Sequence, residues 1–365
     1  MKKLIAIILI LCSCLSLFAC GDEKYPPAPS TDEEAEVMMT FSYEDEKYEI
    51  KYELYRALFL NLSGEYDGGN RDFWKSDAAS VAKADINERI ISLAADIFAT
   101  LHIAKAIGFN PYSKDVNEQI SEYVENSVDG SDDGEFEGFG GDYDAYLASL
   151  KAKNMNYSVQ TLLLRYSIAY DAVIEYYTGT VDSENPTTDM ESGSLEFTKG
   201  DVRAFYDGEL SARVSLIVIN STYIPKETAA ARRDAIASAP TRDEALAKAI
   251  QLTSGTPSDI LDGVVIGKHS LDAAYYSKVT STALELEVDE VSELIEVISA
   301  DTSEYWILYK LDKTEEYFNE NYDAIEDVYI SERIGEIIEN AKSEIIKSKS
   351  AKAAFEELDL SGISM

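Results

Sequence analysis

The sequence predicts an α+β multidomain protein with a mainly helical module, a small α+β domain and a C-terminal helix that returns to the helical module. Up to about residue 178, apolar residues recur in steps of three and four, which is the period of an amphipathic helix. Between residues 198 and 314, helical and strand patterns alternate. With 365 residues, 45% of them apolar, the chain is long enough to form two cores.

Residues 1–19 are predicted to be a signal peptide. Lys2 and Lys3 precede an apolar run over residues 4–11, which is shorter than the ~20 residues that a spanning helix needs. The segment ends in Leu17-Phe18-Ala19-Cys20, which resembles the lipobox of bacterial lipoproteins. This resemblance implies that Cys20 carries a lipid and tethers the chain to the extracytoplasmic face of the cell membrane. The alternative is an ordinary secretory peptide in which Cys20 is incidental.

Cysteine content and charge exclude several kinds of chemistry. Cys12 and Cys14 would leave with the signal peptide, so the mature chain has no intramolecular disulfide, CxxC redox pair or cysteine zinc cluster. The formal net charge is −36, which makes nucleic acid and anionic headgroups poor partners. The charge either serves solubility or attracts basic unfolded chains or divalent cations.

The N-terminal half is organised as a tether followed by a helical domain. Residues 20–36 are rich in proline and acidic residues, so we expect an extended tether. Residues 37–178 are expected to form the helical domain, which opens with a hairpin of residues 37–42 and 48–50. Its helices are predicted at about 51–62, 77–107, 113–127, 143–153 and around Leu163 to Tyr177.

Residues 179–197 combine Gly, Pro, Ser, Thr and acidic residues and are predicted to be a linker. The following α+β domain, residues 198–314, has predicted helices at 201–209, 226–239 and 242–252 and predicted strands at 212–220 and 305–311. Residues 315–365 contain a last amphipathic helix, predicted from Asn321 to about Lys349, which we expect to pack on the helical domain because its apolar stripe must be buried. That stripe is Ile334, Ile338, Ala341 and Ile345.

Five segments in this order carry a resemblance to a known family. They are Val202-Arg203-Ala204-Phe205-Tyr206, the strand of residues 212–219, the turn of residues 262–267, the stretch of residues 283–295 and the closing strand of residues 305–311. In the N-terminal half, Phe73-Trp74, residues 106–109 and residues 143–147 add to it. The chain resembles the SurA/PrsA-like extracytoplasmic foldases, in which a helical chaperone module flanks a parvulin-type peptidyl-prolyl isomerase domain.

The resemblance implies a chaperone that binds unfolded or newly secreted polypeptides without a cofactor. Active parvulins are similar in having a histidine on the first strand and another on the last strand, where this chain has Leu216 and Trp306. The acidic or thiol group that the family places between them has no assigned counterpart among Ser254, Gly255 and Asp259. The candidate prolyl groove is therefore Leu216, His269 and Trp306, with no catalytic residue assigned.

Three functions stay open. The first is a tethered chaperone whose isomerase activity is weak or lost. The second is an active isomerase with a divergent site, and the third is a surface lipoprotein that binds a ligand.

Other candidate sites are weaker. His102 and His269 are the only histidines. His102 is predicted to be a packed or half-exposed residue of its helix, and His269 a solvated turn residue that could also reach a groove. No metal site is predicted. The acidic loop of residues 129–142 begins like a calcium loop at Asp129, but its twelfth residue is Gly140, where a bidentate Glu is needed. Some of the 24 tyrosines could line a cradle that grips extended apolar segments.

Overall fold

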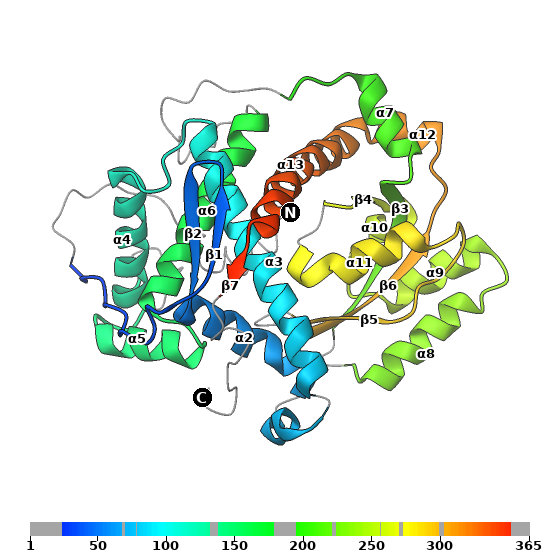
Figure 1. Ribbon diagram of the computed structural model, residues 1–365. Helices are drawn as coiled ribbons and strands as arrows, with labels where there is room; N and C mark the ends of the chain where they lie inside the picture. The colour runs from blue at the N-terminus through cyan, green and yellow to red at the C-terminus, as the bar shows by residue number, and fades with distance from the viewer. Residues whose placement is uncertain are drawn as a thin grey trace. The chain divides into compact units, whose positions relative to one another are not determined.

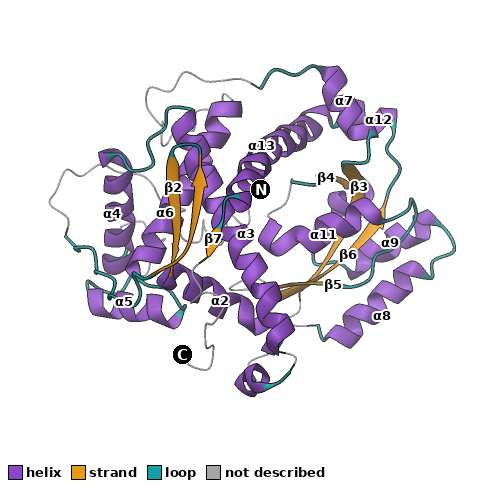
Figure 2. Cartoon of the chain, in the orientation of Figure 1, coloured by secondary structure: helices purple, strands orange, loops and turns teal. Residues whose placement is uncertain are grey.

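The structure is a computed structural model that describes residues 24–67, 70–77, 79–131, 138–178, 195–220, 224–255, 257–269, 273–298 and 303–351. Within these ranges the predicted α+β class is confirmed, because helices predominate and the strands form two antiparallel sheets (Figures 1 and 2). None of the described helices combines the length and the apolar character needed to cross a membrane. The predicted signal peptide, Cys20 and most of the predicted linker lie outside the described residues.

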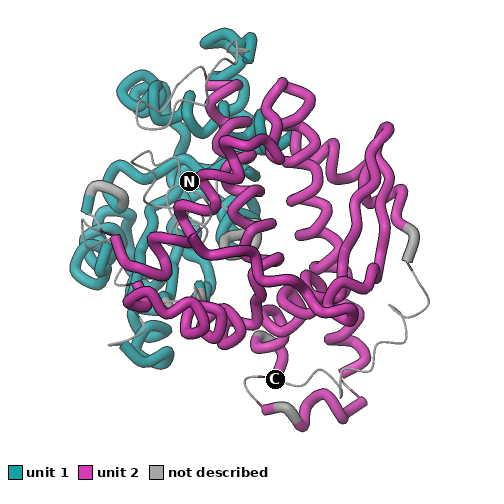
Figure 3. The backbone as a smooth tube through the Cα atoms, turned by 90° about the vertical axis from the view of Figure 1, so that its left-hand side faces the viewer, with its two compact units in different colours: residues 1–9, 194–336 teal, residues 10–193, 337–365 magenta. Residues whose placement is uncertain are grey.

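The described residues divide into two compact units (Figure 3). We call residues 24–178 together with 337–351 the helical unit, and residues 195–336 the sheet unit. The division falls inside helix α13 (Tyr322–Lys347), so the first half of this helix groups with the sheet unit and its second half with the helical unit. The sequence predicts this boundary at residue 314, before the helix.

The helical unit contains a small sheet and five helices in its described N-terminal part. Strands β1 (Val37–Tyr43) and β2 (Glu46–Lys51) form the predicted hairpin, and β7 (Ser350–Ala351) pairs with the other edge of β1. The helices are α2 (Tyr52–Asp67), α3 (Ala79–Ala106), α4 (Lys114–Asp129), α5 (Tyr143–Ala152) and α6 (Tyr157–Thr178), with a short 3₁₀ helix η1 (Arg71–Lys75) after α2. The C-terminal end of the described chain thus returns to the N-terminal hairpin.

Helix α3 lies where the apolar periodicity predicts it. Its first half buries Ile86 and Ile90, whereas every residue from Ile97 to Leu101 is buried, so the second half lies inside the core, and α3 packs against α6. The next helices begin at side-chain caps, since Ser113 accepts a hydrogen bond from the Val116 N–H and Asp142 accepts one from the Ala145 N–H.

The N-terminal segment differs from the expected extended tether. From Lys24 onward it is docked on the helical unit, where Tyr25 and Ala28 pack against a cluster on α4, α5 and α6. Further along, the Ser30 hydroxyl donates to the buried Glu53 carboxylate of α2. Its composition predicts a segment that buries no apolar surface. The structure differs, because Tyr25 and Ala28 partly bury their side chains against the apolar cluster of α4, α5 and α6.

Glu53 joins three segments that are far apart in the sequence. Besides Ser30, the Asn156 amide donates to Glu53 Oε2 at 2.9 Å and the Ser158 hydroxyl donates to Oε1 at 2.7 Å. A buried carboxylate needs such donors, because water no longer solvates it. The carboxylate therefore fixes the start of α6 and the N-terminal segment to α2.

The sheet unit opens with α7 (Lys199–Asp207), whose capping box joins Thr198 and Asp201. Strand β3 (Ser211–Asn220) is followed by α8 (Lys226–Ala237), α9 (Arg242–Leu252) and α10 (Pro257–Leu261). Then come β4 (Val264–Gly267), α11 (Ala273–Glu285), β5 (Ile295–Ile298), β6 (Ser303–Lys310) and α12 (Glu315–Glu320). The strands form one antiparallel sheet in the order β4-β3-β6-β5.

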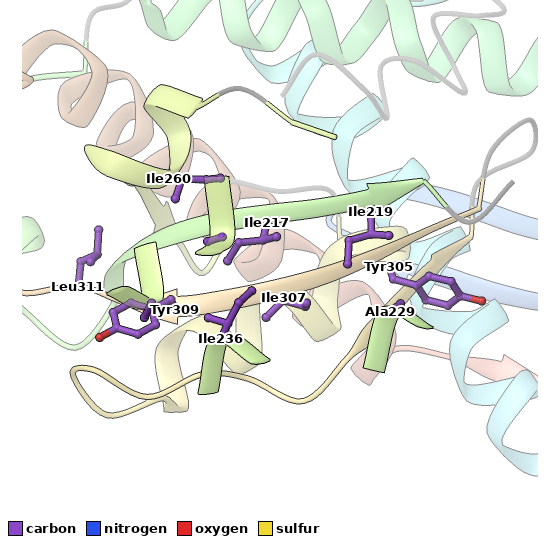
Figure 4. Packing of buried hydrophobic residues seen from close by; sticks show 11 residues of the cluster. Ile217, Ile219, Ala229, Ile236, Ile260, Tyr305, Ile307, Tyr309 and Leu311 are labelled. Carbon is purple, nitrogen blue, oxygen red and sulfur yellow. The ribbon is translucent and has the colours of Figure 1, made fainter. Parts of the chain in front are cut away.

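Both faces of this sheet are apolar and both are covered. On one face, Ile217, Ile219 and Ile307 pack with Ala229, Ile236 and Ile260 from α8 and α10, as Figure 4 shows. On the other face, Val214, Trp306 and Leu308 pack with Val279 and Ala283 of α11. The sequence predicts a turn over residues 262–267, but residues 264–267 form strand β4. The turn lies just before this strand, at Gly263, whose φ is +72°.

We predict that Glu53→Gln lowers the free energy of unfolding by about 1–3 kcal/mol, because an amide would direct an N–H group at donors that need an acceptor. The matched control is Glu49→Gln on the exposed side of β2. Urea unfolding followed by circular dichroism measures both. Equal stability of the two variants would show that the Glu53 contacts contribute little.

Candidate functional site

The two strand positions singled out in the sequence lie together on one face of the sheet. In the β3–β6 pair, Leu216 lies opposite Leu308 and Val218 lies opposite Trp306. Residues opposite each other in an antiparallel pair share a face, and so do residues two apart in one strand. Leu216 and Trp306 are therefore diagonal neighbours on the face that α11 covers.

Part of this face is less covered than the rest. Ala212 and Val214 of β3 are buried, whereas Leu216 and Val218, further along the strand, are only partly buried beside the buried Trp306. We call Leu216, Val218 and Trp306 the apolar strip.

The segment of residues 253–255 borders the strip. The Ser254 N–H donates to the Val218 carbonyl at 2.7 Å, and the Val218 N–H donates to Thr253 Oγ1 at 3.2 Å. A Cβ built on Gly255 would lie 3.7 Å from Val218 Cβ, which is an ordinary contact distance. Ser254 and Gly255, to which the sequence alone assigns no role, thus lie directly beside β3. The structure does not describe the side chain of Asp259.

Helix α11 is held over this face by a buried cation. Lys310 of β6 donates from Nζ to the Ala283 carbonyl at 2.6 Å, at the C-terminal end of the helix, where carbonyl groups lack helical partners. Burial lowers the pKa of Lys310. The sequence carries no signal for this contact, because a lysine at the end of a strand is typically solvated.

Thr280 of α11 is a buried polar residue close to the same face of the sheet. Its side chain is buried, and its hydroxyl has no hydrogen-bond partner in the part of the chain that the structure describes. A buried hydroxyl without a partner is costly unless a water or a ligand satisfies it. No sequence signal marks it, because a threonine in a helix is common.

The polar groups around the strip are largely engaged. The Trp306 indole donates to Glu304 Oε2 at 2.9 Å. The Ser254 hydroxyl donates to the Val218 carbonyl at 2.9 Å and accepts from the Asn220 N–H at 3.1 Å. The strip can therefore desolvate an apolar or prolyl side chain, but it offers no imidazole at the two strand positions.

His269, the third candidate residue, lies against helix α13 within the sheet unit. Its backbone N–H donates to Glu332 Oε2 at 2.7 Å, and its Nε2 lies 3.8 Å from Glu332 Oε1. A Cβ built on Gly335 would lie 2.6 Å from His269 Cγ, so only glycine permits this approach. These contacts bring His269 to α13, whereas Leu216 and Trp306 are brought together under α11.

The candidates in the helical unit are structural. His102 Nδ1 lies 3.0 Å from the Tyr48 hydroxyl and Nε2 lies 3.4 Å from Glu44, so the ring joins α3 to the hairpin, as expected of a packed residue. Both carboxylate oxygens of Asp129 are occupied, by Lys24 Nζ at 2.6 Å and the Tyr25 hydroxyl at 2.7 Å. Residues 132–137 of the acidic loop lie outside the described residues.

The sheet unit also has a polar depression of about 390 Å³, lined by Arg213, Asp262, Thr314, Glu316, Tyr317, Glu320 and Asn321. Its cation is already engaged, because Arg213 donates to the backbone carbonyls of Asp262 and Asp312 and stacks on the Tyr317 ring at 3.8 Å. The arginine thus ties β3 to the chain before β4 and after β6, which is a structural role.

Glu332 gives a pH-dependent prediction. Its side chain is only 2% exposed, and burial raises its pKa, so the native carboxyl keeps its proton to a higher pH than the unfolded one does. Protonation therefore stabilises the fold, and this contribution is lost as pH rises through the native pKa. We expect Glu332→Gln to gain stability relative to the parent chain as pH rises above about 4.5, by roughly 1.4 kcal/mol for each unit by which the native pKa exceeds the unfolded one. Urea unfolding at a series of pH values measures it, with the exposed Glu320→Gln as control, and parallel profiles of parent and Glu332→Gln would contradict the prediction.

Comparisons with known proteins give only distant likenesses. No protein-family model matches the chain, and no curated protein matches it. Among solved structures, it is similar to the foldase protein PrsA from Streptococcus pneumoniae, at 13% identity and a TM-score of 0.26, over 79% of this chain and 93% of that one. PrsA from Lactococcus lactis is 14% identical with a TM-score of 0.23, over 90% of this chain and 100% of that one. PrsA from Bacillus subtilis is 12% identical with a TM-score of 0.23, over 82% and 88% of the two chains. Because TM-scores of this size do not establish a shared arrangement, the function has to follow from the residues of this chain.

Proposed function

We propose that this chain is an extracytoplasmic chaperone, tethered to the cell membrane through a lipid on Cys20, that binds unfolded, newly exported polypeptides and has weak or no prolyl isomerase activity. The observation that carries the proposal is the apolar strip of Leu216, Val218 and Trp306. Two of its members, Leu216 and Trp306, stand at the strand positions where the resemblance to parvulins leads us to expect histidines. An apolar surface there favours binding over catalysis.

The physical reason lies in the barrier to isomerisation. Rotation about a peptide bond has a barrier of about 18–20 kcal/mol, and an enzyme lowers it by desolvating the imide and by placing polar groups around it. The strip supplies the first of these. The Ser254 hydroxyl and the Trp306 N–H are engaged in other hydrogen bonds, so they supply little of the second.

The net charge of −36 supports the same partners. An acidic chain attracts basic unfolded segments over the Debye length and repels the polyanions of a cell envelope. Binding that needs no cofactor can then combine this weak long-range attraction with apolar contacts, each worth roughly 25 cal/mol per Å² of buried apolar surface.

One observation favours the second candidate, an isomerase with a divergent site. The buried Thr280 hydroxyl on α11, the helix that packs on this face, has no partner in the described part of the chain. A substrate carbonyl could satisfy it. The third candidate, a ligand-binding lipoprotein, gains no comparable support from the polar depression, because its arginine, Arg213, already donates to the backbone carbonyls of Asp262 and Asp312.

The test is proline-limited refolding of an unrelated reduced protein, with the mature chain added in catalytic amounts and aggregation followed in parallel. We expect suppressed aggregation and an unchanged slow phase, which normally takes tens to hundreds of seconds. Acceleration of the slow phase that Thr280→Val abolishes would favour the isomerase instead. An effect on neither readout would contradict both.

Leu216→Gln tests the strip directly. We expect the variant to lose at least half of its ability to suppress aggregation, because a partly buried amide lowers the apolar area that a client can cover, at a stability cost of about 1–3 kcal/mol. The matched control is Leu261→Gln, which changes a 54% exposed leucine of the same unit. Equal suppression by both folded variants would place client binding elsewhere.

A further inference from the structure

The docked N-terminal segment fixes where the chain leaves the helical unit toward Cys20. Tyr25 stacks on Tyr143 of α5, with ring centroids 5.2 Å apart, and its hydroxyl donates to Asp129 Oδ1 at 2.7 Å. In return, the Tyr143 hydroxyl donates to the Pro26 carbonyl at 2.8 Å. Lys24, which forms an ion pair with Asp129 at 2.6 Å, is therefore held at the C-terminal end of α4.

A glycine turn presents an exposed aromatic ring at the same place. Gly138 has φ +63°, and a Cβ built on it would lie 2.6 Å from the Asp129 carbonyl carbon, so only glycine fits. The Phe139 and Gly141 N–H groups both donate to the Val128 carbonyl, at 2.7 and 3.0 Å, which pins the turn to the end of α4. Phe139 is nevertheless 40% exposed.

The exposed ring belongs to a continuous aromatic cluster. Phe139 packs edge-on against Tyr146 at 6.0 Å, Tyr146 stacks with Tyr143 at 6.0 Å, and Tyr143 stacks with Tyr25. Pro26 and Pro27, next to Tyr25, are also exposed. We call Tyr25, Pro26, Pro27, Phe139 and Tyr143 the anchor-side patch.

The distance to the lipidation site is short in the sequence. Cys20 precedes Lys24 by four residues, and a fully extended chain spans at most about 3.6 Å per residue, or about 14 Å here. A lipid on Cys20 would therefore bring the bilayer surface close to the residues that Lys24 contacts. A longer free tether would leave the orientation of the helical unit undetermined.

We infer that the anchor-side patch rests on the membrane surface, with Phe139 inserted among the headgroups. The inference rests on the proposed lipid anchor at Cys20. Tyrosine rings favour the membrane interface, and phenylalanine side chains enter the boundary between headgroups and acyl chains. A turn that is already fixed can insert such a ring with little loss of conformational entropy. Within the described chain, Glu125 and Asp129 share a single cation, Lys24, so an excess negative charge remains, which favours a surface of zwitterionic lipid over an anionic one.

The chain is suited to a fluorescence test, because it has no cysteine after Cys20. The full chain carrying Phe139→Cys is purified with its lipid, labelled with an environment-sensitive thiol dye and placed in phosphatidylcholine vesicles. We expect a blue-shifted emission and quenching by spin-labelled lipid. The control is Val81→Cys, a 74% exposed position of the same unit, which should stay solvent-like.

Four further measurements separate the possible failures. Tyr25→Ala in the labelled chain should reduce the blue shift while the protein stays on the vesicles, because it loosens the docking. Solvent-like emission at position 139 on a chain whose lipid is verified by mass spectrometry would overturn the inference and leave the anchor intact. A Cys20 without lipid would overturn both, whereas the aggregation assay with soluble chain tests chaperone function independently. A shift caused by unfolded client and not by vesicles would overturn the inference in favour of a client contact.

Discussion

The antiparallel pairing of β3 with β6 is the constraint on which the sheet unit depends. These two strands occupy the centre of the sheet, and their register runs from Val214 opposite Lys310 to Asn220 opposite Glu304. Both strands are apolar on both faces, so each face must be covered by helices. The same register brings Leu216, Val218 and Trp306 together, so the candidate site is a direct consequence of the pairing that builds the core.

Buried ionisable side chains hold together segments that are distant in the sequence. Lys310 binds the end of α11, Glu53 binds the N-terminal segment and the start of α6, and Glu332 binds the chain after β4. Each contact satisfies backbone or hydroxyl groups that burial would otherwise leave without water. Such contacts add specificity of position more than net stability, because desolvation offsets much of their energy.

The two surfaces that we propose as binding sites are local apolar areas on a strongly acidic chain. The apolar strip lies in the sheet unit and the anchor-side patch in the helical unit. In both, aromatic or branched side chains are fixed by hydrogen-bonded backbone, through residues 253–255 beside β3 and through the glycine turn after α4. A fixed apolar surface loses little conformational entropy when it binds, which suits contacts with variable partners.

The sequence determined the class and most elements, because periodicity and caps are local properties: the hairpin, α3, α4, β3, β6 and the last helix lie close to their predicted positions. It also determined that Leu216 and Trp306 stand at the two strand positions where the resemblance to parvulins leads us to expect histidines. Only the tertiary structure decided that these residues are neighbours, that His269 lies against α13 and that residues from Lys24 onward dock on α4 and α5. Those facts depend on partners that are distant in the chain, and a local pattern carries no information about which partner a side chain meets.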